Sequence, residues 1–221
     1  MPVVPDPEDR ATGEVVRPGV LAVRATAGGV VLAGTVTVAV AGVPEWEKRL
    51  FEFLNGGPDG AEYLLWPPMQ LGSLFGPFVV GGLAWWRWRK WRPALGAVVA
   101  GVVAWQLAKA VKAVVERGRP FELVDGFRRR AGTPLEGLGF VSGHSAVAFS
   151  LAAVCSPYLS RRARVAAYAL AGVVGLTRIQ VSAHLPLDVL GGAALGYGLG
   201  QAWNLAVGVP ADSGAVDPGG S

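Results

Sequence analysis

Apolar residues run in six segments along this chain, separated by short polar stretches. The segments cover residues 20–43, 64–86, 93–114, 140–159, 164–183 and 185–208. Each is close to the ~20 residues that an α-helix needs to cross a hydrocarbon core about 30 Å thick. The pattern therefore predicts an all-α fold, a polytopic membrane protein whose residues 19–209 form six transmembrane helices in a bundle.

Both ends of the chain lack a core-forming pattern. Residues 1–18 contain four prolines and several acids, and residues 210–221 are mostly glycine, proline, serine and aspartate. We expect both to be disordered tails, the first of them cytoplasmic. No clear cleavage site follows the first apolar segment, so we expect this segment to remain as a membrane anchor.

The composition agrees with a membrane protein. Hydrophobic residues make up 52% and charged residues 16%, with a mean hydropathy of +0.40, whereas soluble domains carry about 25% charge. The net charge of +4 lies next to apolar segments, which favours membrane topology over nucleic-acid binding. Cys155 is the only cysteine, which excludes an intrachain disulfide and a zinc site of cysteine pairs. We expect it to be a buried packing residue.

The basic residues predict how the segments are oriented. The stretches 87–92 and 161–164 carry arginine and lysine and no acid, so the positive-inside rule places both in the cytoplasm. With six spans, both termini are then cytoplasmic as well. Tryptophans typical of a membrane–water interface flank the cytoplasmic ends of the second and third segments: Trp85, Trp86, Trp88 and Trp91.

One loop counts against this orientation. Residues 115–139 hold five arginines, yet the alternation of spans places them outside. Such a cluster is tolerable outside if it binds an anionic substrate or lipid phosphate.

Three polar motifs interrupt the apolar segments, and the predicted topology places all three at the outer ends. The residues are Lys112, Arg119 and Pro120 at the end of the third segment; Ser142, Gly143 and His144 opening the fourth; and Thr177, Arg178, His184 and Asp188 around the boundary between the fifth and sixth. Cations that converge bind an anion, and histidines beside that anion can do chemistry on it.

The cations and the Ser-Gly-His motif suit a phosphate. The guanidinium groups of Arg119 and Arg178 match phosphate oxygens, and Lys112 adds a point charge. A helix that begins at Ser142-Gly143 presents free backbone N–H groups to an anion. A structural interpretation stays open for two of these residues, because Lys112 can snorkel to the interface and Ser142 can be an ordinary N-cap.

His184 and Asp188 are four residues apart, which on a continuous helix places both on one face. Asp188 then holds the imidazole through one ring N–H and leaves the other nitrogen free to attack. Pro186, between them, favours the start of a helix at this point. A purely structural His–Asp pair is the alternative.

Together the motifs resemble the signature of the type 2 phosphatidic acid phosphatase family of integral-membrane lipid phosphatases. That signature is Lys-x6-Arg-Pro, Pro-Ser-Gly-His and Ser-Arg-x5-His-x3-Asp. The order and spacings match here, and the resemblance covers residues 45–208. Val141 replaces the proline and Thr177 replaces the serine, and neither change removes a catalytic group.

The resemblance implies phosphoryl transfer through a phosphohistidine, with no metal and no cofactor. His184 is then the nucleophile, Asp188 orients it, and His144 protonates the leaving group and later activates water. The phosphate would be held by Lys112, Arg119, Ser142, Gly143 and Arg178. The implied partners are a lipid phosphate or pyrophosphate and membrane lipids, with no nucleic acid. The sequence leaves the oligomeric state open.

Three alternatives stay open at this point. A phosphotransferase of the same family would pass the phosphate to a lipid or sugar acceptor. A haem protein would use His144 and His184 as axial ligands, and a non-catalytic scaffold would only bind lipid. Arginine outnumbers lysine, and Ala, Val and Gly are abundant, so we expect a multi-pass protein of a bacterial inner (plasma) membrane.

Overall fold

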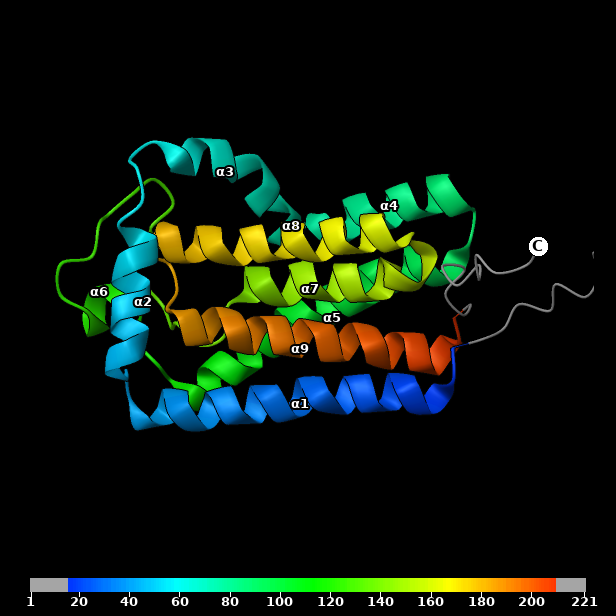
Figure 1. Ribbon diagram of the computed structural model, residues 1–221, viewed down its shortest axis with the longest axis horizontal. Helices are drawn as coiled ribbons and strands as arrows, with labels where there is room; N and C mark the ends of the chain where they lie inside the picture. Colours follow the sequence, from blue (N-terminus) through cyan, green and yellow to red (C-terminus); the bar gives the residue numbers. More distant parts are fainter. Residues whose placement is uncertain (1–15, 210–221) are drawn as a thin grey trace, which may run out of the picture.

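The computed structural model describes residues 16–209, and its helices run side by side (Figure 1). The tails predicted at 1–18 and 210–221 lie outside the described residues, apart from residues 16–18. The elements are α1 (Pro18–Ala41), α2 (Glu45–Asn55), α3 (Ala61–Met69), the 3₁₀ turn η2 (Gln70–Gly72), α4 (Gly76–Trp88), α5 (Trp91–Val115), α6 (Pro120–Leu123), α7 (Gly143–Cys155), the 3₁₀ turn η3 (Ser156–Tyr158), α8 (Arg161–Gln180) and α9 (Pro186–Val207).

Helix α7 is the centre of the bundle. It packs against α9, α5, α8 and α4, and ten of its 13 residues are buried. These buried residues are small or aliphatic, so the neighbouring helices approach closely. Since α7 begins at Gly143, the central position of the helix also fixes the place of the Ser-Gly-His motif.

Glycines on α9 provide its contact with α7. Gly192, Gly196 and Gly200 recur every fourth residue, so they form one stripe along the helix. A Cβ atom on Gly196 would fall on the carbonyl oxygen of Ala146 in α7, and one on Gly192 would fall on that of Ser142. Small residues that let backbones approach are the usual means of packing helices in membranes.

The predicted segments correspond to helices, with one exception. Helices α1, α5, α7, α8 and α9 cover the first, third, fourth, fifth and sixth segments. The prediction of one continuous helix over 64–86 is wrong, because this segment consists of α3, η2 and α4 with a break around Ser73. By length and hydropathy, two stretches of the described chain qualify as membrane spans by themselves, Pro18–Ala41 and Trp91–Leu123. The count of six spans stays a prediction.

Helix α2, in the acidic stretch after the first segment, lies across one end of the bundle (Figure 1). One face points inward, with Glu47, Phe51 and Asn55 buried at intervals of four residues. Trp46 and Phe53 on other faces are 52% and 78% exposed. An amphipathic helix of this kind suits the boundary between membrane and water.

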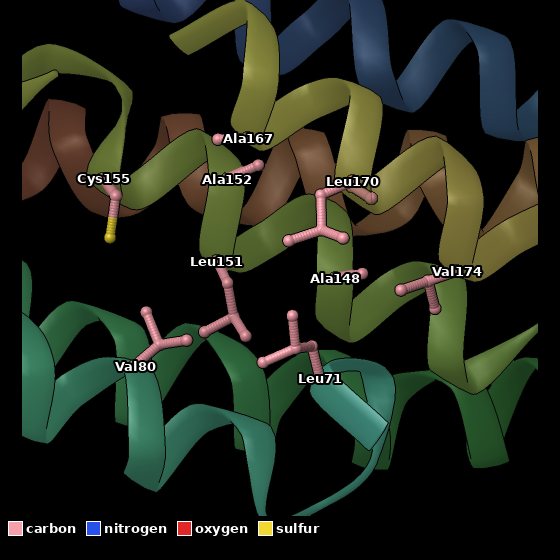
Figure 2. Close-up of a pocket in the computed structure, with 10 residues that line it drawn as sticks. Leu71, Val80, Ala148, Leu151, Ala152, Cys155, Ala167, Leu170 and Val174 are labelled. Carbon is pink, nitrogen blue, oxygen red and sulfur yellow. The ribbon is translucent and has the colours of Figure 1, made fainter. Parts of the chain in front are cut away.

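An apolar cavity of about 120 Å³ lies between α4, α7 and α8 (Figure 2). Leu71, Val80, Leu151 and Val174 line it, together with Cys155. The Cys155 residue is 7% exposed, which confirms the prediction of a buried packing residue.

We expect Gly196→Ala to destabilise the fold. The added methyl group must push α9 away from the Ala146 backbone, and overpacking of this kind costs about 1–3 kcal/mol. The matched control is Gly172→Ala in α8, where nothing lies within 4 Å of an added Cβ. Thermal unfolding in detergent should give a lower Tm for Gly196→Ala only, and equal values for both variants would contradict this packing.

Candidate active site

All three polar motifs meet at one end of the bundle, drawn at the left in Figure 1. The carboxyl ends of α5 and α8 and the amino ends of α7 and α9 come together there. The basic stretches 87–92 and 161–164 begin α5 and α8 at the opposite end. The chain therefore separates its motifs from its acid-free basic loops by the length of the bundle, as the sequence predicts.

Asp188 lies beside His184, although not on a continuous helix. His184 is in the 181–185 loop and α9 begins at Pro186, which confirms the helix start predicted from Pro186, so the condition of a continuous helix is not met. Asp188 is at the third position of α9, where its Oδ2 accepts the backbone N–H of Leu185 at 2.9 Å. This contact fixes the carboxylate, as in the return half of a capping box.

The distance from His184 Nδ1 to Asp188 Oδ2 is 3.5 Å. This is longer than a good hydrogen bond, and Nδ1 has no hydrogen-bond partner among the described residues. Both side chains are buried, with exposed fractions of 4% and 0%. Contacts of this kind are often long in the absence of substrate and shorten when it binds.

Arg178 is a buried cation with no acidic partner in the described chain. The residue is 7% exposed, and among the described residues its side chain makes one hydrogen bond, from Nη1 to the sulfur of Met69 at 3.2 Å. Its Nε has no partner among residues 16–209. A buried guanidinium normally pairs with an anion, so this arrangement leaves a place for one.

Lys112 and Arg119 combine structural contacts with free donors. Lys112 Nζ donates to the carbonyls of Leu138 and Gly139 at 2.9 and 2.7 Å. The third of its three protons remains available to a ligand. Arg119 donates from Nε to the Glu136 carbonyl and from Nη1 to the Ala183 carbonyl. Its Nη2 makes no hydrogen bond within the described residues and remains for a ligand.

Ser142 is the N-cap of α7, as the structural alternative expects. Its Oγ accepts from the backbone N–H and the hydroxyl of Ser145, at 3.4 and 3.0 Å, and the residue is fully buried. Its own backbone N–H donates to the Asp188 carbonyl at 2.8 Å. Ser142 therefore joins the first turn of α7 to that of α9, and Gly143 follows with its N–H at the start of the helix.

His144 is half-buried near His184 and has the ring of Trp105 against its edge, with centroids 5.8 Å apart. Gly72 in η2 packs on its backbone, where an added Cβ would be 2.6 Å from the His144 carbonyl oxygen. The break between α3 and α4 thus allows the chain to pass close to this histidine.

The 181–185 loop that carries His184 is held by two neighbouring segments. Asn55 in α2 donates to the Gln180 carbonyl and to Ser182 Oγ. Buried Arg130 donates to the carbonyls of Asn55 and Gln180, and Thr133 donates to Val181. Arg130, one of the five arginines of the 115–139 loop, is therefore structural. This leaves fewer arginines in the loop that could bind an external anion.

Two further residues at the site were missed from the sequence, Arg117 and Glu47. Arg117 Nη1 donates to Asp188 Oδ1 at 2.8 Å and to Glu47 Oε1 at 3.2 Å. Glu47 is fully buried, although the sequence shows it only as one acid among several in a polar stretch. No local spacing signals this contact, since 70 residues separate Arg117 from Glu47.

Burial is the largest cause that holds the pKa of His184 well below its ordinary value of 6.5. The positive charges of Lys112, Arg178 and Arg119 lower this pKa further, and His144 adds a smaller effect. The imidazole is therefore neutral at physiological pH, which a nucleophile requires. Lys112, Arg178, Arg119 and His144 are therefore close enough to His184 to affect its charge.

A family model described as the PAP2 superfamily matches residues 90–209. A search of the curated proteins found no match. Two solved structures resemble the chain. One is the first transmembrane PAP2 type phosphatidylglycerolphosphate phosphatase from Bacillus subtilis, with a TM-score of 0.61 and 22% identity over 80% of this chain and 94% of that one. The other is Aquifex aeolicus LpxE, with a TM-score of 0.62 and 25% identity over 70% of this chain and 92% of that one.

We expect the His184 imidazole to stay neutral in mild acid. His144→Gln leaves His184 as the only histidine, because the chain has two, so ¹⁵N NMR of histidine-labelled protein in detergent reports on it alone. At pH 5.5 the ring should show the shifts of a neutral imidazole, whereas a histidine with a pKa of 6.5 would be about nine-tenths charged. Lys112→Met, which removes a positive charge, should raise the pKa. A titration midpoint near 6.5 for His184 in the His144→Gln protein would contradict the convergence of cations.

Proposed function

The chain belongs to the PAP2 superfamily, and from this premise we propose that it is a membrane phosphatase that removes phosphate from a lipid phosphate or lipid pyrophosphate through a phosphohistidine. The observation that carries the proposal is Arg178, a buried cation without an acidic partner in the described residues, next to a neutral His184. A phosphoryl group supplies the missing anion and meets the nucleophile at the same place.

In the first step the phosphoryl group is transferred to His184. Because Nδ1 faces Asp188, the attacking atom is Nε2. The Nε2–P bond forms as the bond from phosphorus to the leaving oxygen breaks, and His144 gives its proton to that oxygen. The ring becomes positive and keeps its Nδ1 proton, which Asp188 stabilises. Lys112, Arg119 and Arg178 offset the charge on the phosphoryl oxygens.

In the second step water releases the phosphate. His144, now neutral, takes a proton from the water as its oxygen attacks phosphorus. The P–N bond breaks, its electron pair returns to Nε2, and both histidines recover their starting protonation states. The cations supply the charge stabilisation that a metal supplies in other phosphatases, so we propose that the reaction needs none.

Two observations support a lipid rather than a soluble substrate. An apolar groove of about 360 Å³ lies between α2, α8 and α9. Its lining includes Pro186 and Leu187, which directly follow the 181–185 loop that carries His184. The Bacillus subtilis protein that shares this fold is a phosphatidylglycerolphosphate phosphatase. A lipid keeps its chains in the bilayer while its headgroup reaches the cations from the side.

We propose that the site faces away from the cytoplasm of a bacterial cell, in a multi-pass inner-membrane protein. The positive-inside rule places the basic ends of α5 and α8 in the cytoplasm, and the site lies at the opposite end of the bundle. The counterargument from the 115–139 loop is reduced, since Arg117 and Arg130 are buried in ion pairs.

We expect phosphate release to continue without divalent metal. The purified protein in detergent, with excess chelator, should release phosphate from at least one member of a panel of lipid monophosphates and pyrophosphates. Arg178→Gln should reduce kcat/KM about 10²–10³-fold, because it removes a charged donor to the transition state. Activity that disappears with chelator and returns with magnesium would refute metal independence.

We expect acid-labile, base-stable label on the protein after brief reaction with ³²P-labelled substrate. His184→Ala should abolish the label, because it removes the nucleophile. Asp188→Asn should slow labelling strongly, since it also leaves Arg117 paired with Glu47 alone. His144→Gln should still accept label from a substrate with a good leaving group but release it slowly. Label on His184→Ala protein would show that the nucleophile is assigned to the wrong residue.

We expect residues of the 126–137 loop to face outward. Ala131→Cys and Arg162→Cys, each in a Cys155→Ser background, place one exposed thiol at each end of the bundle. An impermeant thiol reagent should label Ala131→Cys in intact cells and Arg162→Cys only after lysis. The reverse pattern would invert the orientation.

A further inference from the structure

Three buried charged side chains form a line behind His184. Asp188 Oδ1 accepts from Arg117 Nη1 at 2.8 Å. Both terminal nitrogens of the same guanidinium pair with the carboxylate of Glu47. The exposed fractions of the Arg117, Glu47 and Asp188 side chains are 4%, 0% and 0%. The contacts thus run in the order His184, Asp188, Arg117, Glu47, from the predicted nucleophile to α2.

The Glu47 carboxylate is held in place by several hydrogen bonds. Besides Arg117, its Oε1 accepts the backbone N–H of Leu187 at 2.9 Å, one residue before Asp188. Arg117 also donates to the carbonyl of Gly42, just ahead of α2. Helix α2 is therefore joined to the first turn of α9 through Glu47, both directly and through Arg117.

Burying three charges is unfavourable unless each is matched, and apolar replacements of such groups are often as stable. Here the three side chains together carry one net negative charge, because the two carboxylates of Glu47 and Asp188 outnumber the one guanidinium of Arg117. That charge faces a histidine whose other charged neighbours are the cations Lys112, Arg119 and Arg178, and titratable His144. Without Glu47, Arg117 would neutralise Asp188, and His184 would face only positive charge.

We propose that Glu47 and Arg117 are positioning residues for the phosphoryl transfer, which hold the Asp188 carboxylate toward His184 and keep one net negative charge beside it. This inference rests on the proposed function. When Nε2 bonds to phosphorus, the imidazole becomes positive, and the net negative charge of the three side chains stabilises it. Neither residue touches the phosphoryl group, so both act through Asp188.

The principal test is Glu47→Gln, which keeps the shape and removes the charge. We expect kcat to fall about tenfold, because a nearby unit charge is worth on the order of one pK unit, while KM stays unchanged. Glu47→Asp, which restores the charge, should recover part of the loss.

The matched control is Glu62→Gln. Glu62 is also a buried carboxylate near an arginine, 3.9 Å from Arg130 Nε with an exposed side-chain fraction of 8%, but it has no contact with Asp188. We expect kcat close to that of the parent protein. An equal loss in both variants, or full activity in Glu47→Gln, overturns the inference.

The charge balance predicts a second result. Glu47→Gln with Arg117→Met removes one charge of each sign and restores the net negative charge, so this double variant should have a higher kcat than Glu47→Gln alone. A purely structural role predicts the opposite, because each change removes contacts. A folded double variant that is no more active than Glu47→Gln overturns the inference, and Tm in detergent reports whether it is folded.

A readout without turnover separates this inference from the proposed function. In the His144→Gln background, the Nδ1 proton of His184 reports its interaction with Asp188. Its NMR resonance should move upfield in Glu47→Gln, because Asp188 becomes a weaker acceptor, and should not move in Glu62→Gln. An unmoved resonance in both overturns the inference, even if no lipid phosphate is hydrolysed. Phosphate release by the parent protein tests the proposed function alone.

Discussion

A buried arginine without an acidic partner in the described part of the chain is the constraint around which this site is organised. Arg178 is 7% exposed, and its hydrogen-bond partner is a methionine sulfur. Burial of a charge without a counterion is strongly unfavourable, so the fold must hold this side chain by packing and stability gained elsewhere. Under the proposed function a phosphoryl group would supply the counterion that Arg178 lacks among the described residues.

Asp188, next to His184, differs from Arg178 because its charge has partners within the protein. Asp188 is matched by a backbone N–H, by Arg117 and, through Arg117, by Glu47. Close packing supports this arrangement, since the glycine stripe of α9 brings its first turn within hydrogen-bonding distance of Ser142. Asp188 is thus satisfied within the protein, whereas Arg178 has no acidic partner among the described residues.

Much of the site could be predicted from the sequence, because its residues lie at fixed short spacings in apolar segments. Lys112, His144, Arg178 and His184 come together as those motifs indicate. Arg117 and Glu47 could not be predicted, because their contacts join positions 70 or more residues apart and neither residue stands out in its polar stretch. The contacts of Arg130 with Asn55 and Gln180 were hidden for the same reason.

The helices were predicted better than their interruptions. Hydrophobicity alone does not show that 64–86 is broken, although Pro67, Pro68 and the Gly72-Ser73 pair are the signals of a break. At this break Gly72 comes close to the His144 backbone. The start of α9 between His184 and Asp188, in contrast, was predicted correctly from Pro186. In both cases the site requires a chain direction that a continuous helix does not provide.

The measurement that tests this account most directly is an experimental structure of the protein with tungstate, a heavy analogue of phosphate that can be located by its anomalous scattering. The account predicts one tungstate at the end of the bundle, in contact with Arg178, Arg119 and Lys112 and adjacent to Nε2 of His184. In Arg178→Gln protein the tungstate should be lost from this place. A tungstate bound only at the basic 87–92 or 161–164 stretch, with nothing beside His184, would contradict it.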